Sequence, residues 1–424
     1  MIEPRSPKLL FVHSGSPKKR MTFVAASQLG AQVHLLNPET NWASSLVQQT
    51  HCTAGLSIPE VVALAEDLHS REQFDGIVTF WEEDVPTCAL ISARLGLPGN
   101  APQAALAARS KYRMRRAFEQ AGVPVPTFRR FFDHSSLIEA CAAVGTPAVL
   151  KPEWGSDSEW VLRVETPQQA IQTFQSIRDD VRIQDCIYRY QSGTYVLESL
   201  LIGPEVSVEG VVQNGQVTIY AIIDKAKMDE DSFVERGETT PSLFPEDVQQ
   251  QIRTMVRNGV AALELDNCGI HAEVKITADG PRIIEIGARM GGDCIHALVQ
   301  RVYGIDLAIE NIRAALGQPV SPATAALGYG ISRTLVPEKP GLVRLERRGQ
   351  PRASRNLIEV VLTKGPGDCV AVPPHGYDNL AWISVWGRSY REASRRIDAQ
   401  AARLQSAFVI EDQQQVFYHT EAAG

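Results

Sequence analysis

The sequence predicts a mixed α/β and α+β protein. Near the N-terminus, short apolar runs alternate with amphipathic helical stretches, an order typical of a parallel α/β layer. In the middle of the chain, strand-like runs come as adjacent pairs joined by tight turns, which is typical of antiparallel hairpins. A chain of 424 residues is too long for one average core, so we expect roughly two to four packed units.

The N-terminal α/β layer is expected over residues 1–105. Its strands and helices are predicted at Leu9–Val12, Met21–Gly30, Gln32–Leu36, Ile58–Ser70 and Gly76–Phe80. The turn-forming cluster at 97–102 marks its end, because Pro and Gly interrupt regular structure. A basic helix follows over residues 110–122, within a smaller part expected at 106–195.

Antiparallel sheet is expected over residues 196–320, followed by an α+β unit over 321–424. The first predicted hairpin joins Glu205–Val212 to Gln216–Ile223, and the second joins Ile270–Thr277 to Arg282–Gly287. Between them, Glu246–Leu263 has the apolar spacing of an amphipathic helix. The C-terminal unit is predicted to hold strands near Ile358–Leu362 and Ala381–Trp386 and a helix at Tyr390–Leu404.

Composition is that of a globular protein, with 44% hydrophobic and 21% charged residues. The net charge of -7 argues against a broad nucleic-acid surface, and no apolar run approaches the ~18 residues of a membrane helix. The seven cysteines are scattered singly, which indicates buried thiols in a reducing compartment. We therefore expect a cytoplasmic protein without nucleic-acid or membrane partners.

The second hairpin carries a pair of acidic residues. With a three-residue turn at 278–280, Thr277 faces Pro281 and Glu273 lies directly opposite Glu285. Such close like charges need neutralising, and a divalent cation with phosphate oxygens does so. Alternation adds Gly287 and Arg289 to the same face. The alternative is a surface hairpin with solvated, splayed glutamates.

Two further patterns upstream have the residue types of a nucleotide site. An apolar strand delivers Lys151 into a Gly/Ser loop, where a lysine and backbone N–H groups suit a phosphate. Downstream, Glu198 and Glu205 flank a short apolar hinge that could grip a base and a ribose. Taken singly, each is also compatible with an ordinary strand end or with solvated acids.

In this order, these features resemble the ATP-grasp superfamily. The motifs are Lys111 on the basic helix, Val149-Leu150-Lys151-Pro152, Glu198 to Glu205, and Glu273 with the run from Glu285 to Gly292. The resemblance covers about residues 1–320 and implies the ATP-grasp fold: an N-terminal α/β layer, a central lid, an antiparallel ATP-binding domain and a C-terminal subdomain. The C-terminal tail looks like that of bacterial L-amino-acid ligases and the carnosine-synthase group.

The resemblance implies roles for individual residues. ATP would be held by Lys111, Lys151, Ser156, Ser158, Glu198, Leu200, Leu201 and Glu205. Glu273 and Glu285 would bind Mg²⁺, with Mn²⁺ as an alternative, and Arg289 would hold the transferring phosphoryl group and then the acyl phosphate. The Gly291-Gly292 turn, with Asp293 and Cys294 nearby, would border the amino-acid pocket. Apart from the resemblance, Glu82 or Glu83 at a strand end, and Lys227, Glu235 and Glu238 in a long loop, are candidates for substrate contacts.

The sequence departs from the family pattern in two places. Gly287 stands where an asparagine metal ligand is usual, and the phosphate loop carries Asp157 and Glu159 where small residues are usual. His271-Ala272-Glu273 matches part of a zinc-deaminase motif, but no P-C-x-x-C follows, and His271 is predicted to be a packed strand histidine.

The leading hypothesis is an ATP-dependent carboxylate–amine ligase that joins amino acids through an acyl phosphate, for a dipeptide or a small secondary metabolite. The alternatives are a carboxylase or purine-pathway type of ligase, and a degenerate ATP-binding sensor, which Gly287 favours. Substrates would be small carboxylates and amines. Homodimers through the N-terminal or C-terminal layer are common among similar proteins.

Overall fold

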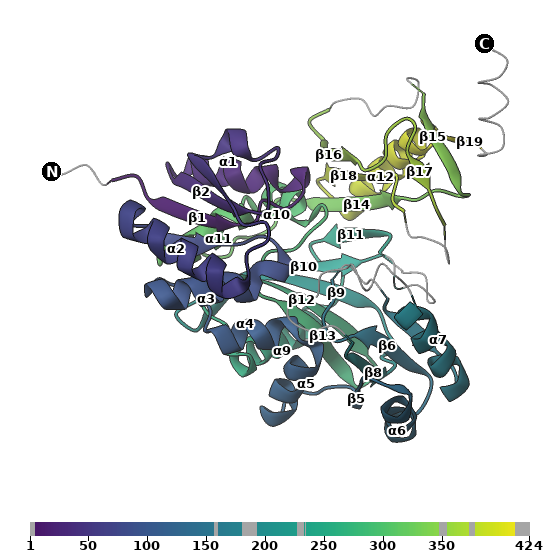
Figure 1. Cartoon of the computed structure of the whole chain (residues 1–424). Helices are drawn as coiled ribbons and strands as arrows, with labels where there is room; N and C mark the ends of the chain where they lie inside the picture. Colours follow the sequence, from purple (N-terminus) through teal and green to yellow (C-terminus); the bar gives the residue numbers. More distant parts are fainter. Residues whose placement is uncertain are drawn as a thin grey trace, which may run out of the picture. The chain divides into compact units, whose positions relative to one another are not determined.

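A computed structural model describes residues 5–156, 160–179, 193–226, 233, 235–346, 354–372 and 378–411. The chain forms two compact units, and Figure 1 shows its elements. The first unit comprises residues 1–220, 244–291 and 305–323, and the second comprises 221–243, 292–304 and 324–424. The predicted mixed α/β class is confirmed.

The first unit begins with a parallel sheet of strand order β3-β2-β1-β4. Its strands are β1 (Lys8–Val12), β2 (Gln32–Asn37), β3 (Gln49–Cys52) and β4 (Gly76–Val78), and its helices are α1 (Arg20–Gln28), α2 (Ile58–Glu72) and α3 (Val85–Leu95). The predicted elements are present, although β4 ends two residues earlier than expected. Strand β3 was missed because its residues are polar and lack apolar alternation.

The second sheet of this unit is small, with the order β5-β8-β6-β7. Its strands are β5 (Phe128–Phe131), β6 (Ala148–Pro152), β7 (Leu162–Val164) and β8 (Tyr195–Ser199). The helices of this region are α4 (Pro102–Arg109), α5 (Lys111–Gln120), α6 (His134–Val144) and α7 (Pro167–Asp179). Phe131, Phe174 and Tyr195 form an aromatic core beneath this sheet.

The predicted hairpins belong to an eight-stranded sheet, in which β12 (Cys268–Thr277) lies between β9 (Glu205–Gln213) and β13 (Gly280–Gly287). Helix α9 (Glu246–Ala262) packs on β13, and α11 (Leu307–Ala315) packs on β9 and β12. Strand β10 (Gln216–Lys225) begins in the first unit and ends in the second.

The turn of the second hairpin differs from the prediction, but its acidic pair does not. Thr277 pairs with Gly280 across a two-residue turn, so the expected three-residue turn is wrong. Four residues after Gly280 on β13, a bulge at Ile284 shifts the register by one position. Glu273 therefore does pair with Glu285. Without the bulge, Glu285 would face the opposite side of the sheet.

In the second unit, an antiparallel arrangement of order β11-β14-β18-β16 stands beside a small sheet of order β17-β15-β19. The strands are β11 (Gly237–Thr240), β14 (Tyr329–Leu335), β15 (Gly341–Leu345), β16 (Leu357–Leu362), β17 (Cys369–Val370), β18 (Ala381–Gly387) and β19 (Phe408–Glu411), and the helices are α10 (Ile295–Tyr303) and α12 (Tyr390–Gln405). Buried Ile383, Val385 and Ile397 belong to the core between α12 and the strands.

Among the described residues, no helix is both long and apolar enough to span a bilayer. Six cysteines are described, none of them in a disulfide. Cys52 and Cys369 are exposed, which corrects the expectation that all of the thiols are buried. Cys186 lies outside the described residues.

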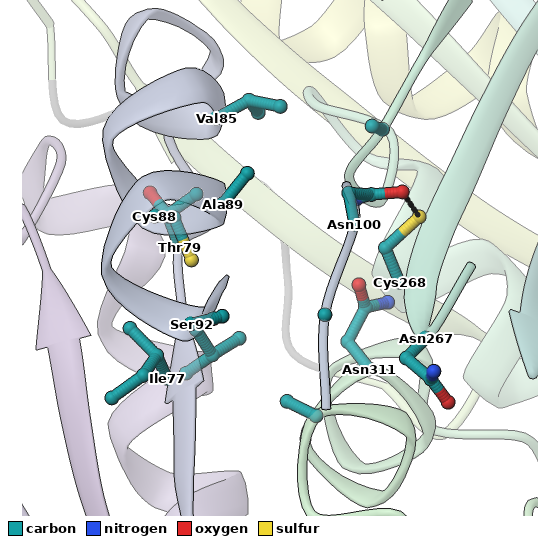
Figure 2. A pocket seen from close by; sticks show the side chains of 14 residues that line it. Ile77, Thr79, Val85, Cys88, Ala89, Ser92, Asn100, Asn267, Cys268 and Asn311 are labelled. Carbon is teal, nitrogen blue, oxygen red and sulfur yellow. Dashed lines mark hydrogen bonds between the residues drawn. The ribbon is translucent and has the colours of Figure 1, made fainter. Parts of the chain in front are cut away.

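A small cavity lies where the N-terminal layer meets β12 and α11, inside the first unit. Figure 2 shows Cys88 and Ser92 on α3 across from Asn100 and Cys268. Its volume is about 30 Å³, enough for one or two water molecules and too small for a nucleotide. Burial raises the pKa of the Cys88 and Cys268 thiols to about 12, so both are unreactive.

Gly203 provides a test of how the chain between β8 and β9 is fixed against the second hairpin. Its φ is 148°, and a Cβ at this position would lie 2.0 Å from the backbone oxygen of Ile276. We expect Gly203→Ala to lower the free energy of unfolding by about 2 kcal/mol or more, because the backbone has to move. Thermal unfolding measures this. The control is Ile202→Ala at the neighbouring, 75% exposed side chain; equal melting temperatures for the two variants would contradict the prediction.

Candidate active site

The carboxylate pair of the second hairpin lies among cations. Glu273 and Glu285 are opposite each other, and Lys111 Nζ is 3.5 Å from Glu285 Oε2. On the other side, His271 Nδ1 is 2.7 Å from Glu209 Oε1, and His271 Nε2 is 3.6 Å from Glu273 Oε1. The close like charges are thus neutralised from both sides by groups of the protein.

His271 is charged although it is buried. Burial opposes the charge, but the carboxylates of Glu209 and Glu273 outweigh it and raise the pKa of His271 to about 10. The prediction of a packed strand histidine is correct for its burial but missed its ion pairs. Glu209 also accepts a hydrogen bond from the backbone N–H of Gly291, at 3.2 Å.

Helix α5 starts beside the end of β6. The backbone N–H of Lys111 donates to the Glu153 carbonyl at 3.0 Å, and the Ser110 hydroxyl donates to the Glu153 carboxylate. Lys111 Nζ donates to the Gly155 carbonyl at 2.9 Å. The helix N-terminus and the predicted phosphate loop are therefore in contact.

The same helix contributes a buried face to the site. Lys111 and Arg115 are buried although the run that contains them is basic. Lys151 Nζ lies 2.7 Å from Glu198 Oε2, and Arg115 Nε lies 2.9 Å from Glu198 Oε1. Burial favours the neutral acid, but these two cations lower the pKa of Glu198 to about 2.

The hinge after β8 leads from Glu198 to a second acid. Leu200 and Leu201 are half-buried and follow the strand directly. Glu205 opens β9 and pairs with Lys275 on β12, at 3.0 Å between Lys275 Nζ and Glu205 Oε2. The two acids of the hinge are thus both held by basic side chains.

Glu82 lies at the start of the short helix η3 (Glu82–Asp84), just beyond β4. Its carboxylate contacts Arg289 Nε at 2.5 Å and Arg109 Nη1 at 3.1 Å. Burial raises its pKa, but Arg289 and Arg109 pull the pKa down to about 2. A Cβ on Gly287 would lie 3.1 Å from Glu82 Oε2. A side chain at position 287 would therefore require this carboxylate to shift by a few tenths of an ångström.

The remaining predicted residues fall into three groups. Ser156 donates to Glu83 Oε1 at 2.9 Å in the first unit, whereas Ser158 and the loop residue Lys227 lie outside the described residues. Glu235, Gly292, Asp293 and Cys294 belong to the second unit. There Glu235 pairs with Lys225, Asp293 is exposed, and Cys294 is buried before α10.

Sequence reasoning missed four charged residues that complete this arrangement: Arg109, Arg115, Glu209 and the ion-pairing role of His271. Spacing offered a signal for one of them. Arg115 is four residues after Lys111, so both lie on one helix face with buried Met114 and Phe118.

Comparison with known families agrees with this geometry. Residues 144–297 match the model of the ATP-grasp domain, and residues 23–99 match that of the ATP-grasp N-terminal domain. The chain therefore contains an ATP-grasp domain and an ATP-grasp N-terminal domain.

Among curated proteins, the chain is 28% identical over 342 residues to carnosine synthase 1 of Mus musculus, covering 76% of this chain and 41% of that protein. It is also 28% identical over 268 residues to alanine–anticapsin ligase of Bacillus subtilis, covering 59% of this chain and 56% of that one. The chain thus spans about half the length of these relatives.

The crystal structure of an L-amino acid ligase from Bacillus licheniformis superposes with a TM-score of 0.79 at 20% identity. The match covers 97% of this chain and 100% of that one. At this identity the likeness establishes the fold.

The charge on His271 predicts a pH dependence of stability. Its pKa is about 10 in the folded chain against an ordinary value of 6.5, so the stabilisation is complete below about pH 6.5 and is lost as the pH rises toward 10. We expect the melting temperature of the wild type to fall over this range more than that of His271→Asn. Thermal unfolding at pH 6, 8 and 10 measures it, with His69→Asn as the control. Parallel pH profiles for wild type and His271→Asn would contradict a charged His271.

Proposed function

We propose that the chain is an ATP-dependent carboxylate–amine ligase that joins amino acids by an amide bond. An acyl phosphate is the intermediate, and ADP and phosphate are released. The observation that carries the proposal is the pairing of Glu273 with Glu285 next to Lys111. Carboxylates, lysines and an arginine gathered in this way suit a magnesium–triphosphate group. The names of the ligase relatives support the amino-acid substrates.

Glu273 and Glu285 fit a divalent cation because they are paired, half-buried and supply the hard oxygen ligands that Mg²⁺ prefers. Mn²⁺ has similar ligand preferences and is an alternative. Such an ion, when held by these two carboxylates, would supply positive charge that offsets the negative charge developing on the phosphate oxygens. In this proposal, Lys111 exchanges Glu285 for a phosphate oxygen.

The nucleotide would lie along the two neighbouring sheets of the first unit. Lys111 and Lys151 would hold phosphates together with Ser156 and Ser158 of the loop. Glu198 and the backbone at Leu200 and Leu201 would hold the adenine, and Glu205 the ribose hydroxyls. The burial of Glu198 and Glu205 supports this assignment, since buried acceptors select their partners strictly.

The chemistry then needs no nucleophile from the protein. A carboxylate oxygen of the first substrate attacks the γ-phosphorus, and the bond to ADP breaks. A neutral amine attacks the acyl carbon, an amide forms, phosphate leaves, and the amine proton passes to solvent. Arg289 would leave Glu82 to hold the transferring phosphoryl group, while the Gly291-Gly292 backbone borders the acyl phosphate.

Glu82 is a candidate partner for an ammonium group once Arg289 has moved away. Glu235, Asp293 and Cys294 are candidates from the second unit. We further propose a cytoplasmic enzyme that acts on small molecules, with a homodimer as its assembly.

The proposal is tested by measuring phosphate release from ATP and Mg²⁺ over pairs of amino acids, with products identified by mass spectrometry. Release that needs two amino acids and yields their dipeptide is the expected result. Release with bicarbonate or a ribonucleotide precursor instead would make this a carboxylase or purine-type ligase. Nucleotide binding without turnover would make it a sensor.

We expect Glu285→Gln to lower the rate of phosphate release at least 100-fold, because a neutral amide binds a divalent cation weakly. Added EDTA should abolish release, and Mg²⁺ or Mn²⁺ should restore it. The matched control is Glu119→Gln at a half-exposed glutamate on α5, which should be unchanged. Wild-type activity in Glu285→Gln would argue against the metal assignment.

A further inference from the structure

Arg115 is among the largest fully buried side chains of the protein and has no role in the pattern that carries the family resemblance. Its relative exposure is 1%, although it lies in a basic run between exposed Arg113 and Arg116. Taking a guanidinium out of water is costly unless its partners are well placed. Its partners therefore indicate what it does.

The first partner is Glu198. Arg115 Nε lies 2.9 Å from Oε1, and Arg115 Nη2 lies 3.0 Å from Oε2, so the guanidinium meets both carboxylate oxygens. Of these two contacts, the one between Nη2 and Oε2 has hydrogen-bond geometry, and the one between Nε and Oε1 is an ion-pair contact. A charge-assisted hydrogen bond and an adjacent ion pair therefore hold the carboxylate. Lys151 Nζ lies 2.7 Å from Glu198 Oε2.

The second partner is the bulge of the second hairpin. Arg115 Nη2 also donates to the Ile284 carbonyl at 2.7 Å, and Ile284 is the residue without a partner across the hairpin. The extra residue of a bulge leaves the regular ladder, so its backbone groups need other partners. One guanidinium thus joins α5 to β8 and to the strand of Glu285.

The two cations beside Glu198 differ in what happens when a nucleotide binds. In the proposed function, Lys151 turns to the phosphates, which removes one neutralising charge from a buried carboxylate. Arg115 is bound to protein groups on both sides and stays. A buried carboxylate left without a cation takes up a proton and becomes a hydrogen-bond donor. With Arg115 in place, Glu198 remains an acceptor.

We infer that Arg115 is a positioning residue that keeps Glu198 an acceptor-only carboxylate and so makes the site selective for a purine with a 6-amino group. The inference rests on the nucleotide-binding part of the proposed function. Adenine offers an N–H donor to Glu198, whereas a 6-oxo purine presents an acceptor to it and is rejected.

The test compares binding of ATP and inosine triphosphate, which has a 6-oxo group, to the full chain with Mg²⁺ and no amino acid, by calorimetry. For Arg115→Met, we expect the dissociation constant of ATP to rise at least tenfold and that of inosine triphosphate to change less than threefold. Arg115→Lys keeps the charge. It should raise the dissociation constant of ATP about threefold and leave that of inosine triphosphate unchanged. Arg116→Met makes the same chemical change on the exposed face and should leave both constants unchanged.

A double substitution separates positioning from general destabilisation. If Arg115 acts through Glu198, adding Arg115→Met to Glu198→Gln should not lower the preference for ATP over inosine triphosphate any further. An equal loss of affinity for both nucleotides in Arg115→Met would overturn the inference. If that variant does not fold, equal losses in Arg115→Lys would overturn it too.

The outcomes for the inference and for the proposed function differ. Wild-type protein that binds neither nucleotide would refute the nucleotide site and the inference together. Selective binding that depends on Arg115, with no phosphate release for any amino-acid pair, would refute the ligase and support the inference.

Discussion

The contact on which most of this site depends is that of the buried Arg115 with Glu198 and the Ile284 carbonyl. Removing one partner of such a buried ion pair typically costs about 3–5 kcal/mol, because the other charge is left without compensation. Here the cost would not stay local. The same guanidinium also binds the bulge that brings Glu285 opposite Glu273. Arg115 therefore holds both Glu198, which is expected to bind the adenine, and the strand of Glu285, which is expected to bind the metal.

Around this contact, the cations expected to hold phosphates are each paired with a carboxylate of the protein. Lys111 pairs with Glu285, Lys151 with Glu198, and Arg289 with Glu82. Gly287 lies beside the third of these pairs. A Cβ at this position would lie 3.1 Å from Glu82 Oε2, so a side chain there would require the carboxylate to shift slightly. The glycine thus relieves a close contact with an acid of the N-terminal layer.

Much of the fold followed from local pattern, since apolar periodicity and turn residues predict strands and helices directly. The prediction that Glu273 pairs with Glu285 is correct, although it assumed the wrong turn length. The turn is one residue shorter than expected, and the bulge at Ile284 compensates. A bulge has no simple sequence signal here, because Ile284 sits within an apolar run. Likewise Arg109 and Arg115 look like ordinary basic helix residues, and only tertiary packing reveals their burial.

The matched ion pairs have a consequence for how a nucleotide reaches the site. Because Lys111, Lys151 and Arg289 each already face an acid, the site projects little attraction into the surrounding water. Nucleotide binding would then depend little on long-range electrostatic attraction and mainly on direct contacts within the site. Encounter rates should accordingly vary little with ionic strength, unlike those of an open basic cleft.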